Sequence, residues 1–392
     1  MVPARLIPLF RAILDAGGRA LVIGGAVRDH LRGEPSKDFD IEVHDLDADA
    51  LAAVLRRFGR VDEVGRSFGV LKLRMGGQDL DVSLPRRDSR AGSGHRGIRA
   101  QSDPHMDVVE AARRRDLTIN AIAWDPISGA FVDPFDGRDD LANGVLRAVD
   151  PATFGEDPLR ALRVAQFAAR FGFRVDATLE SLCADMPLAE LPAERIRGEV
   201  EKLLLKGTVP SVGWEFARRT RIWAKVLPTW DVPAPAHLDR LASDPVRRQI
   251  PELPRRFALM LACACGGQPL DALDRMHIHR WERYPVRDAV LFLSREAGES
   301  SPSENRVVRL ADEGDLELLA VLRDDAALAA AATKLGVLRA PLPPLLQGRD
   351  LMTLGLPPGP EMGRVLGELR ELQFEGRITT VHDALAWART RL

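Results

Sequence analysis

Two glycines and an arginine near the start of the chain have the types and spacing of a phosphate-binding turn. An apolar run over 20–23 ends at Gly24 and Gly25, and a short helix is expected to follow. Because glycine lacks a Cβ atom, backbone N–H groups at such a turn can approach an anion, which the positive helix N-terminus also attracts. Arg28 can add a guanidinium group with paired donors. The pattern predicts a site for a phosphorylated ligand.

Asp38 and Asp40 stand two residues apart in a second expected strand. Their side chains would point the same way, so the carboxylates repel each other unless a cation lies between them. A few hard oxygen ligands suit Mg²⁺ that also binds triphosphate oxygens. Asp81, in a later strand, could supply a third acid for a two-metal site acting on a 3′-hydroxyl and a triphosphate. Alone, each feature is also typical of an exposed strand or turn, and it is the combination that indicates catalysis.

A second polar group comprises Arg114, Arg115, Asp116 and Asn120. A helix beginning at 108 and running through these residues would place Asp116 and Asn120 on one face, where they could meet a nucleotide. A charged helix N-terminus explains the same residues without any function.

A third group begins where Glu156 and Asp157 precede Pro158. This order is typical of a helix start with acids at its positive end. Asp157 accepts hydrogen bonds and Arg160 donates them, so the pair could contact the Watson–Crick edge of a base in place of a template strand. Arg163 lies three residues further, on the same helical face as Arg160. An N-cap with an intrahelical salt bridge is the alternative explanation.

Other classes of protein are disfavoured by composition and spacing. Neither G-x-x-x-x-G-K-[ST] nor G-x-G-x-x-G occurs at Gly24, so the turn is neither a P-loop nor a dinucleotide fingerprint. The net charge of −2 neither indicates nor excludes a nucleic-acid partner. No run of 18 apolar residues predicts a membrane span. Three cysteines without C-x-x-C spacing predict free structural thiols and a reducing cytoplasm: Cys183, Cys263 and Cys265.

The elements that must position these groups change in character near residue 150. Before it, short apolar runs alternate with turns and predict strands over 20–23, 39–43, 70–73, 79–84 and 131–132, helices over 26–31 and 49–58, and a polar loop over 86–107. The hairpin pattern of 70–84 favours a mixed or antiparallel sheet. After it, helical periodicity prevails.

We therefore predict an α+β protein with a mixed-sheet head followed by an all-helical neck, body and tail. The expected divisions are a catalytic head over 1–150, a neck carrying the base-contacting motif over 151–215, a body over 216–300 and a tRNA-binding tail over 301–392.

The motifs GGAVRD, KDFD, DLDVSLPR, RRRDLTINAIA, DPFDGRDDL and EDPLRALRVAQFAARFGF follow one another between about residues 21 and 173. Together they resemble the class II CCA-adding tRNA nucleotidyltransferases and the related bacterial poly(A) polymerases. The resemblance implies a nucleotidyltransferase (polymerase β-like) head. It is looser from about residue 195 onward, where the chain matches the helical body and tail without sharp motifs.

The resemblance also implies roles for single residues. Asp38 and Asp40 would bind Mg²⁺, with Asp81 as a third catalytic acid. The remaining roles are triphosphate binding (Gly24, Gly25, Arg28), contact with sugar and phosphate (Arg114, Arg115, Asp116, Asn120), selection of CTP and ATP over GTP and UTP (Asp157, Arg160) and support of the phosphates (Arg163).

The implied reaction is template-independent addition of C and A to the 3′ end of tRNA in the cytoplasm, with release of pyrophosphate. The helical part would hold the tRNA, and neither a membrane nor a stable protein partner is expected. Segment 91–97 departs from the commonest form of the family's flexible loop, which leaves A-only and CC-only addition open. Poly(A) tailing also stays open, although the chain lacks a long basic C-terminal extension.

Two further alternatives are a catalytically silent RNA-binding protein of the same fold and a small-molecule nucleotidyltransferase, which would not need a large helical body. Some relatives carry a phosphohydrolase domain with metal-binding His-Asp pairs. His44-Asp45 and His382-Asp383 occur here without the other histidines of such a site, and we expect them to be surface or cap residues.

Overall fold

The computed structural model describes residues 2–36, 38–62, 69–90, 98–298 and 302–391. Lys37, the first residue of the KDFD motif, and segment 91–97, which departs from the family's flexible loop, lie outside the described residues. The chain divides into two compact units, one of Met1–Glu199 with Val212–Val226 and one of Val200–Ser211 with Leu227–Leu392. The division into head, neck, body and tail stays a prediction.

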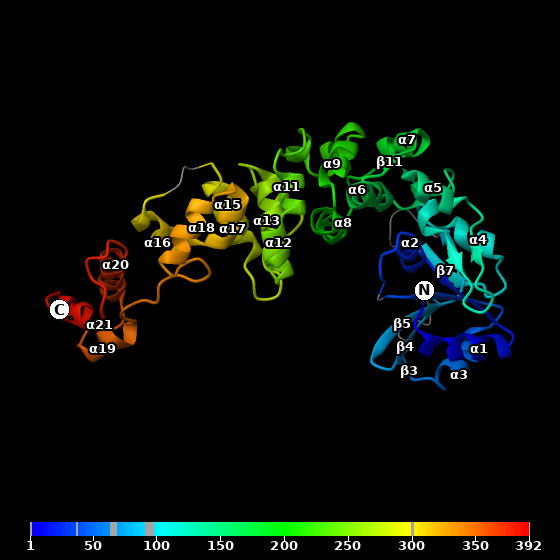
Figure 1. The fold of residues 1–392 in the computed structure, drawn as a ribbon, viewed down its shortest axis with the longest axis horizontal. Helices are drawn as coiled ribbons and strands as arrows, with labels where there is room; N and C mark the ends of the chain where they lie inside the picture. The colour runs from blue at the N-terminus through cyan, green and yellow to red at the C-terminus, as the bar shows by residue number, and fades with distance from the viewer. Residues whose placement is uncertain (1, 37, 63–68, 91–97, 299–301, 392) are drawn as a thin grey trace. The chain divides into compact units, whose positions relative to one another are not determined.

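A seven-stranded sheet lies at the centre of the head, within the described residues (Figure 1). Its strand order is β3-β4-β5-β2-β1-β8-β9. The strands are β1 (Arg19–Ile23), β2 (Asp40–His44), β3 (Arg60–Asp62), β4 (Val70–Met75), β5 (Gln78–Ser83), β8 (Ala123–Trp124) and β9 (Phe131–Val132). Strands β2 and β5 run parallel, and the other neighbours run antiparallel. The predicted mixed sheet is confirmed.

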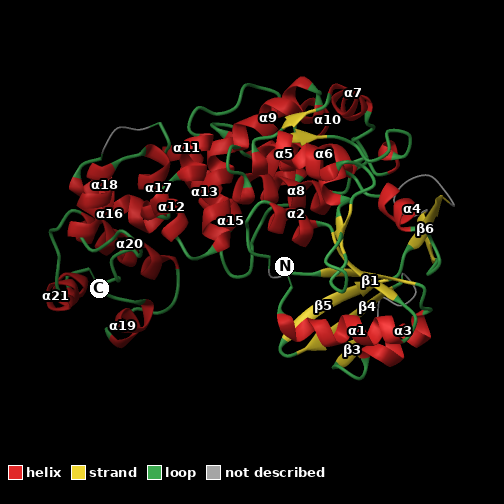
Figure 2. Ribbon diagram, turned by 45° about the vertical axis from the view of Figure 1, so that its right-hand side comes forward, coloured by secondary structure: helices red, strands yellow, loops and turns green. Residues whose placement is uncertain are grey.

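The two faces of this sheet differ in chemistry because side chains alternate along each strand. One face packs in an apolar core with α1 (Ile7–Asp15) and α3 (Ala48–Leu55), which lie beside the sheet in Figure 2. On β2, Ile41 and Val43 belong to that core. Asp40, Glu42 and His44 have the opposite parity, and the first two pair in register with Ile23 and Leu21 of β1. The second face of β2 therefore carries three ionisable side chains.

Segment 86–107 is not the polar loop that the sequence predicts. It contains an antiparallel hairpin of β6 (Arg86–Arg90) and β7 (Ile98–Ser102), paired from Arg86 with Ser102 to Arg90 with Ile98. Backbone groups make these pairs, and the sequences of the two strands, RRDSR and IRAQS, contain too little apolar alternation to predict them.

The helix expected to begin at 108 is present, but it does not run through the second polar group. Helix α4 (Val108–Arg113) ends before the second polar group, and a 3-10 turn, η4 (Thr118–Asn120), leads into β8. Leu117 is extended and bridges to Ala148, while the N–H of Thr118 donates to the carbonyl of Arg147 at 3.0 Å. These partners are distant in sequence, so helical spacing within the segment could not predict them.

The rest of the first unit is mostly helical, as predicted. Besides the short helix α2 (Gly25–Leu31) and the turn η5 (Phe154–Glu156), it contains α5 (Gly137–Asn143), α6 (Leu159–Phe171), α7 (Ala177–Asp185) and α10 (Ile222–Val226). Helices α8 (Ala193–Lys206) and α9 (Pro210–Arg219) cross the boundaries of the units. Within the described residues, the neck contains one strand, β11 (Arg174–Val175), and is otherwise without strands. Strand β11 pairs with β10 (Val145–Leu146).

The second unit is helical. Its helices are η6 (Pro228–Trp230), α11 (Leu238–Ser243), α12 (Pro245–Gln249), α13 (Leu253–Cys265), α14 (Leu270–Arg275), α15 (Val286–Glu296), α16 (Glu304–Glu313), α17 (Leu316–Arg323), α18 (Ala326–Lys334), α19 (Gly348–Thr353), α20 (Pro360–Phe374) and α21 (Val381–Arg389). Helices α19 to α21 share a small apolar core of their own. In none of the described residues is there a helix with the length and apolar character needed to cross a bilayer. The three cysteines are free thiols, as predicted.

Candidate active site

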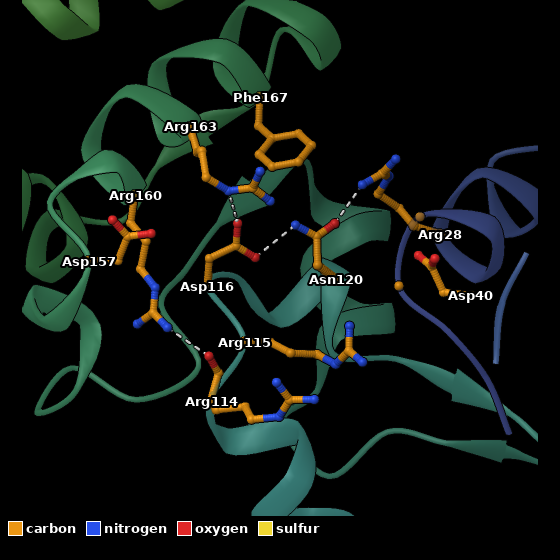
Figure 3. A pocket seen from close by; sticks show the side chains of 12 residues that line it. Arg28, Asp40, Arg114, Arg115, Asp116, Asn120, Asp157, Arg160, Arg163 and Phe167 are labelled. Atoms are coloured by element: carbon orange, nitrogen blue, oxygen red, sulfur yellow. Dashed lines mark hydrogen bonds and ion pairs between the residues drawn. The ribbon is translucent and has the colours of Figure 1, made fainter. Parts of the chain in front are cut away.

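A pocket of about 410 Å³ lies where the head meets α6 within the first unit (Figure 3). Side chains from α2, β2, the segment after α4, and α6 line it. The lining residues are Gly24, Gly25, Arg28, Asp40, Arg114, Arg115, Asp116, Asn120, Asp157, Arg160, Arg163 and Phe167. All the residues that the sequence predicts for nucleotide binding are therefore brought together, although their individual roles stay predictions.

The glycine turn forms one wall through its backbone geometry. Gly24 has φ 69° and ψ −131°, a conformation that essentially only glycine adopts without strain. A Cβ atom at this position would lie 3.3 Å from Nη1 of Arg115 and 3.9 Å from Oδ2 of Asp40. The absent side chain thus leaves space between an arginine and a carboxylate that both face the pocket.

Arg28 is almost fully buried, with an exposed fraction of 3%. Its Nη1 donates to Oδ1 of Asn120 at 2.5 Å, and its Nε and Nη2 donate to Oδ1 of Asp29 at 2.8 and 2.7 Å. The guanidinium also lies over the rings of Phe167 and Phe171. Desolvation lowers the pKa of Arg28 from its ordinary value, and Asp29 opposes the shift. Arg28 therefore joins the turn to the rest of the pocket through contacts within the protein.

Asp116 and Asn120 meet although they do not share a helix. Oδ1 of Asp116 accepts hydrogen bonds from Nδ2 of Asn120 at 3.0 Å and from the N–H of Leu117 at 2.8 Å. Oδ2 accepts from Nε of Arg163 at 2.7 Å. Burial alone would raise the pKa of Asp116, but the charge of Arg163 and these hydrogen bonds hold it below its ordinary value. Asp116 is an ionised acceptor whose two oxygens already have partners.

Asp40 lines the pocket, whereas Asp38, which precedes β2, and Asp81 on β5 are not among its lining residues. Asp40 pairs in register with Asp81 across the parallel strands β2 and β5, and both residues are exposed, as is Asp38. Nearby protein atoms still desolvate Asp40, and this raises its pKa above the ordinary value. Arg115 opposes the shift, whereas the like charges of Asp81 and Asp38 add to it. Nζ of Lys72 lies 3.7 Å from Oδ1 of Asp81.

These carboxylates fit a divalent cation by charge and donor type. Hard oxygen donors that repel each other suit Mg²⁺, which usually keeps several ligands from water or substrate phosphates. No set of three His, Cys, Asp or Glu side chains among the described residues is already arranged around one metal position.

His44 is not the surface or cap residue that we expected. It is 2% exposed, its Nδ1 donates to the carbonyl of Met106 at 3.0 Å, and its Nε2 lies 3.6 Å from Oε1 of Glu42. His44 lies on the same sheet face as Asp40, but the segment at Met106, 62 residues away in sequence, packs against it. His382 is exposed and Asp383 pairs with Thr380 at the start of α21, as expected for cap residues.

Glu42 was not predicted to have a role, yet it contacts two arginines of the pocket. Its Oε2 accepts from Nη2 of Arg114 at 3.1 Å and lies 3.8 Å from Nη2 of Arg115. Burial would raise its pKa, but His44, Arg115 and Arg114 lower it to about 2. The one signal in the sequence is its spacing, two residues after Asp40 on the same strand.

Asp157 and Arg160 both line the pocket, and each has protein partners. Arg195 on α8 donates to both oxygens of Asp157, at 3.1 and 2.9 Å. Asp157 also accepts from the N–H of Leu159 at 3.1 Å, which is the helix cap of the alternative explanation. Arg160 donates to the backbone carbonyls of Thr153, Phe154 and Arg114, at 3.1, 3.4 and 2.7 Å. Sequence reasoning missed Arg195, because its partner lies 38 residues away.

Comparison with known proteins identifies the sheet-containing part. Residues 20–147 match the family model described as "Poly A polymerase head domain". This part of the chain is similar to that head domain. The resemblance that the motifs indicate is thus confirmed over this part of the chain. The head domain contributes the glycine turn, the aspartates and the second polar group, whereas the pocket residues of α6 lie beyond it.

Curated relatives match about half of the chain. The chain is 39% identical over 218 residues to a "Multifunctional CCA protein" of Aromatoleum aromaticum, covering 54% of this chain and 51% of that protein. It is 38% identical over 212 residues to a protein of the same name from Nitrosococcus oceani, covering 53% and 50%. The chain thus spans about half the length of the curated relatives that it matches.

Solved structures share the fold over nearly the whole chain. The CCA-adding enzyme of Bacillus stearothermophilus in complex with CTP superposes with a TM-score of 0.76 at 22% identity, covering 100% of this chain and 98% of that one. The CCA-adding enzyme of Thermotoga maritima complexed with tRNA-CCA gives 0.63 at 22% identity, covering 99% and 95%. The predicted fold, a polymerase β-like head domain followed by a helical remainder, is confirmed.

Proposed function

We propose that this protein is a Mg²⁺-dependent nucleotidyltransferase that adds C and A to the 3′ end of tRNA, using CTP and ATP and releasing pyrophosphate. The observation that carries the proposal is the composition of one pocket. The glycine turn, Asp40 and four arginines lie in the same lining as the donor and acceptor pair at the start of α6, Arg160 and Asp157. Groups for a triphosphate and groups for a base edge are thus within reach of one nucleotide.

The relatives support the choice of substrate. The curated relatives are named for CCA, and the solved structures of the same fold include complexes with CTP, ATP and tRNA. We extend these substrates to this chain, with the helical body (216–300) and tail (301–392) holding the tRNA. A tRNA substrate would place the reaction in the cytoplasm.

In this proposal the residues of the pocket bind and orient the nucleotide. Arg114 and Arg115 neutralise the triphosphate, and backbone N–H groups at Gly24 and Gly25 approach it. Asp157 accepts a hydrogen bond from the base and Arg160 donates one to it. Phe167 provides an apolar surface in the lining of the pocket. Holding the α-phosphorus near the 3′-hydroxyl of the bound tRNA accounts for much of the rate enhancement, since phosphoryl transfer depends mainly on positioning and charge stabilisation.

Asp38 and Asp40, with Asp81 as a third acid, would hold the Mg²⁺. When bound, the ion supplies charge neutralisation at the phosphates and a more acidic 3′-hydroxyl. Burial raises the pKa of Asp40, and the like charges of Asp81 and Asp38 add to the shift that Arg115 opposes. A cation bound beside Asp40 would lower its pKa.

The test is nucleotide addition to a tRNA that ends before CCA. The protein, the tRNA and Mg²⁺ are incubated with CTP, ATP or both, and the 3′ ends are sequenced. We expect CC with CTP alone and CCA with both. A alone, CC alone despite ATP, or a long A tail would replace CCA addition by the corresponding narrower or poly(A) activity.

Asp40→Ala tests the role of the carboxylates. We expect it to abolish incorporation of labelled CTP while tRNA binding and thermal unfolding stay unchanged, and removal of Mg²⁺ by a chelator to act in the same way. Asp79→Asn, on the same sheet but exposed and paired with Arg74, is the matched control and should stay active. Full activity of Asp40→Ala, or RNA binding without any incorporation by the wild type, would refute the proposal in favour of a silent RNA-binding protein.

A further inference from the structure

One face of strand β2 carries three ionisable residues in a row, and the middle one has no assigned role. Asp40 lines the pocket, and His44 contacts the backbone at Met106. Glu42 stands between them, 2% exposed, and does not line the pocket. A role in the reaction would therefore have to act through other side chains.

Burial of Glu42 is tolerated because cationic groups surround its carboxylate. A buried carboxylate without such partners would be strongly unfavourable. Oε2 accepts from Nη2 of Arg114 at 3.1 Å and lies 3.8 Å from Nη2 of Arg115, while Oε1 faces Nε2 of His44 at 3.6 Å. The carboxylate is thus fixed by the strand beneath it and by a different neighbour at each oxygen.

Both arginines reach from Glu42 into the pocket. Arg114 and Arg115 belong to the lining, and their side chains are 27% and 19% exposed. Nη1 of Arg115 lies beside the open space at Gly24 while its Nη2 faces Glu42. One terminal nitrogen of the Arg115 guanidinium thus faces the carboxylate of Glu42, while the other is directed at the glycine turn.

We propose that Glu42 is a positioning residue that holds Arg114 and Arg115 in the orientation needed to bind the nucleotide triphosphate. Strand β2 would then serve the reaction twice, through Asp40 at the reacting phosphate and through Glu42 behind the arginines. This inference rests on the proposed function, because it assumes that the ligand of the pocket is a nucleoside triphosphate.

Glu42→Gln tests the inference because it keeps the shape of the side chain and removes its charge. Arginines without their counter-ion adopt other rotamers, so we expect the KM for CTP to rise by about tenfold or more, the range of one charge-assisted hydrogen bond. The kcat at saturating CTP should fall less, because the loss concerns binding. Glu42→Asp retains the charge and should recover part of the affinity. Asp79→Asn is the control for removal of one acid from the same sheet.

A double-mutant cycle separates positioning from mere stability. In the background of Arg115→Gln, the effect of Glu42→Gln on the KM should shrink to threefold or less, that is, to less than about a third of its effect in the wild type, because part of what Glu42 holds is already lost. Equal effects in both backgrounds, or a wild-type KM in Glu42→Gln, would overturn the inference. If Glu42→Gln does not fold, Glu42→Asp in the same cycle gives the answer.

Failure of the proposed function would look different. The wild type would then incorporate no nucleotide into tRNA. Calorimetric titration with CTP and Mg²⁺ does not need turnover and still compares the wild type with Glu42→Gln and Glu42→Asp. A wild type that binds CTP while Glu42→Gln binds it at least tenfold more weakly supports the positioning role, and equal affinities, or no binding by the wild type, overturn it.

Discussion

Gly24→Ala asks whether the backbone of the turn shapes the pocket. At φ 69° and ψ −131°, an alanine would be strained by about 1–3 kcal/mol. At roughly 2–4 °C per kcal/mol, the thermal midpoint should fall by about 2–12 °C. The new Cβ atom would also lie 3.3 Å from Nη1 of Arg115, so the guanidinium must shift by a few tenths of an ångström. We therefore expect a higher KM for CTP together with lower stability.

Two other glycines separate these effects. Gly25 begins α2 with ordinary helical backbone, and a Cβ there would lie 3.5 Å from Nη2 of Arg28, an ordinary contact. Gly25→Ala should therefore stabilise the fold by about 0.5–1 kcal/mol. Gly76, in the turn between β4 and β5, has φ 57° and open space around it. Gly76→Ala should cost about 1–2 kcal/mol and leave the KM unchanged.

Thermal unfolding by circular dichroism and the KM for CTP, measured on the wild type and the three variants, give the comparison. Only Gly24→Ala should both lower the thermal midpoint and raise the KM for CTP. The reasoning is refuted if Gly25→Ala loses as much stability as Gly24→Ala, or if Gly24→Ala melts within 1 °C of the wild type with the same KM.

Three further predictions concern other parts of the molecule. Arg195→Ala removes the bidentate partner of Asp157, so incorporation of UTP and GTP relative to CTP and ATP should rise by about tenfold, measured in single-nucleotide assays. The lowered pKa of Asp116 means that its stabilising effect is full above the unfolded-state pKa of about 4 and is lost as the pH falls through the native value, so Asp116→Asn should flatten the acid limb of urea-unfolding stability. Burial raises the pKa of every thiol to between about 11 and about 12, so a chromogenic disulfide reagent at pH 8 should modify the cysteines only after denaturation: Cys183, Cys263 and Cys265.

The parts of the fold that local spacing determines could be predicted from the sequence. Strand β1 follows from its continuous apolar run, β4 and β5 follow from apolar alternation, and α6 follows from helical periodicity. Apart from Phe167, the lining residues of the pocket were predicted from residue types that suit a nucleotide, even where the expected local structure was wrong. Asp116 and Asn120 meet through a hydrogen bond across a 3-10 turn instead of along a helix face. Side-chain chemistry was thus a better guide to the site than helical periodicity.

The features that escaped prediction depend on partners far away in sequence. Helix α4 ends because Leu117 and Thr118 bond to the strand-like segment at Ala148 and Arg147. In the sequence, Glu42 is one more polar residue on a strand. Its importance becomes visible only in the structure, where Arg114, 72 residues later, donates a hydrogen bond to it. Such contacts leave no local periodic signal.

The two sides of the pocket share hydrogen bonds, so neither can move alone. Arg160 donates to the backbone carbonyl of Arg114 at 2.7 Å, and Arg163 donates to the carboxylate of Asp116 at 2.7 Å. Both acceptors flank Arg115, whose guanidinium lies beside Gly24. A shift of α6 that accommodates a poorly fitting base would therefore displace the arginines proposed to bind the phosphates. If the proposed function holds, the wrong base should then be disfavoured in kcat as well as in KM, because its phosphates are held out of position for the transition state.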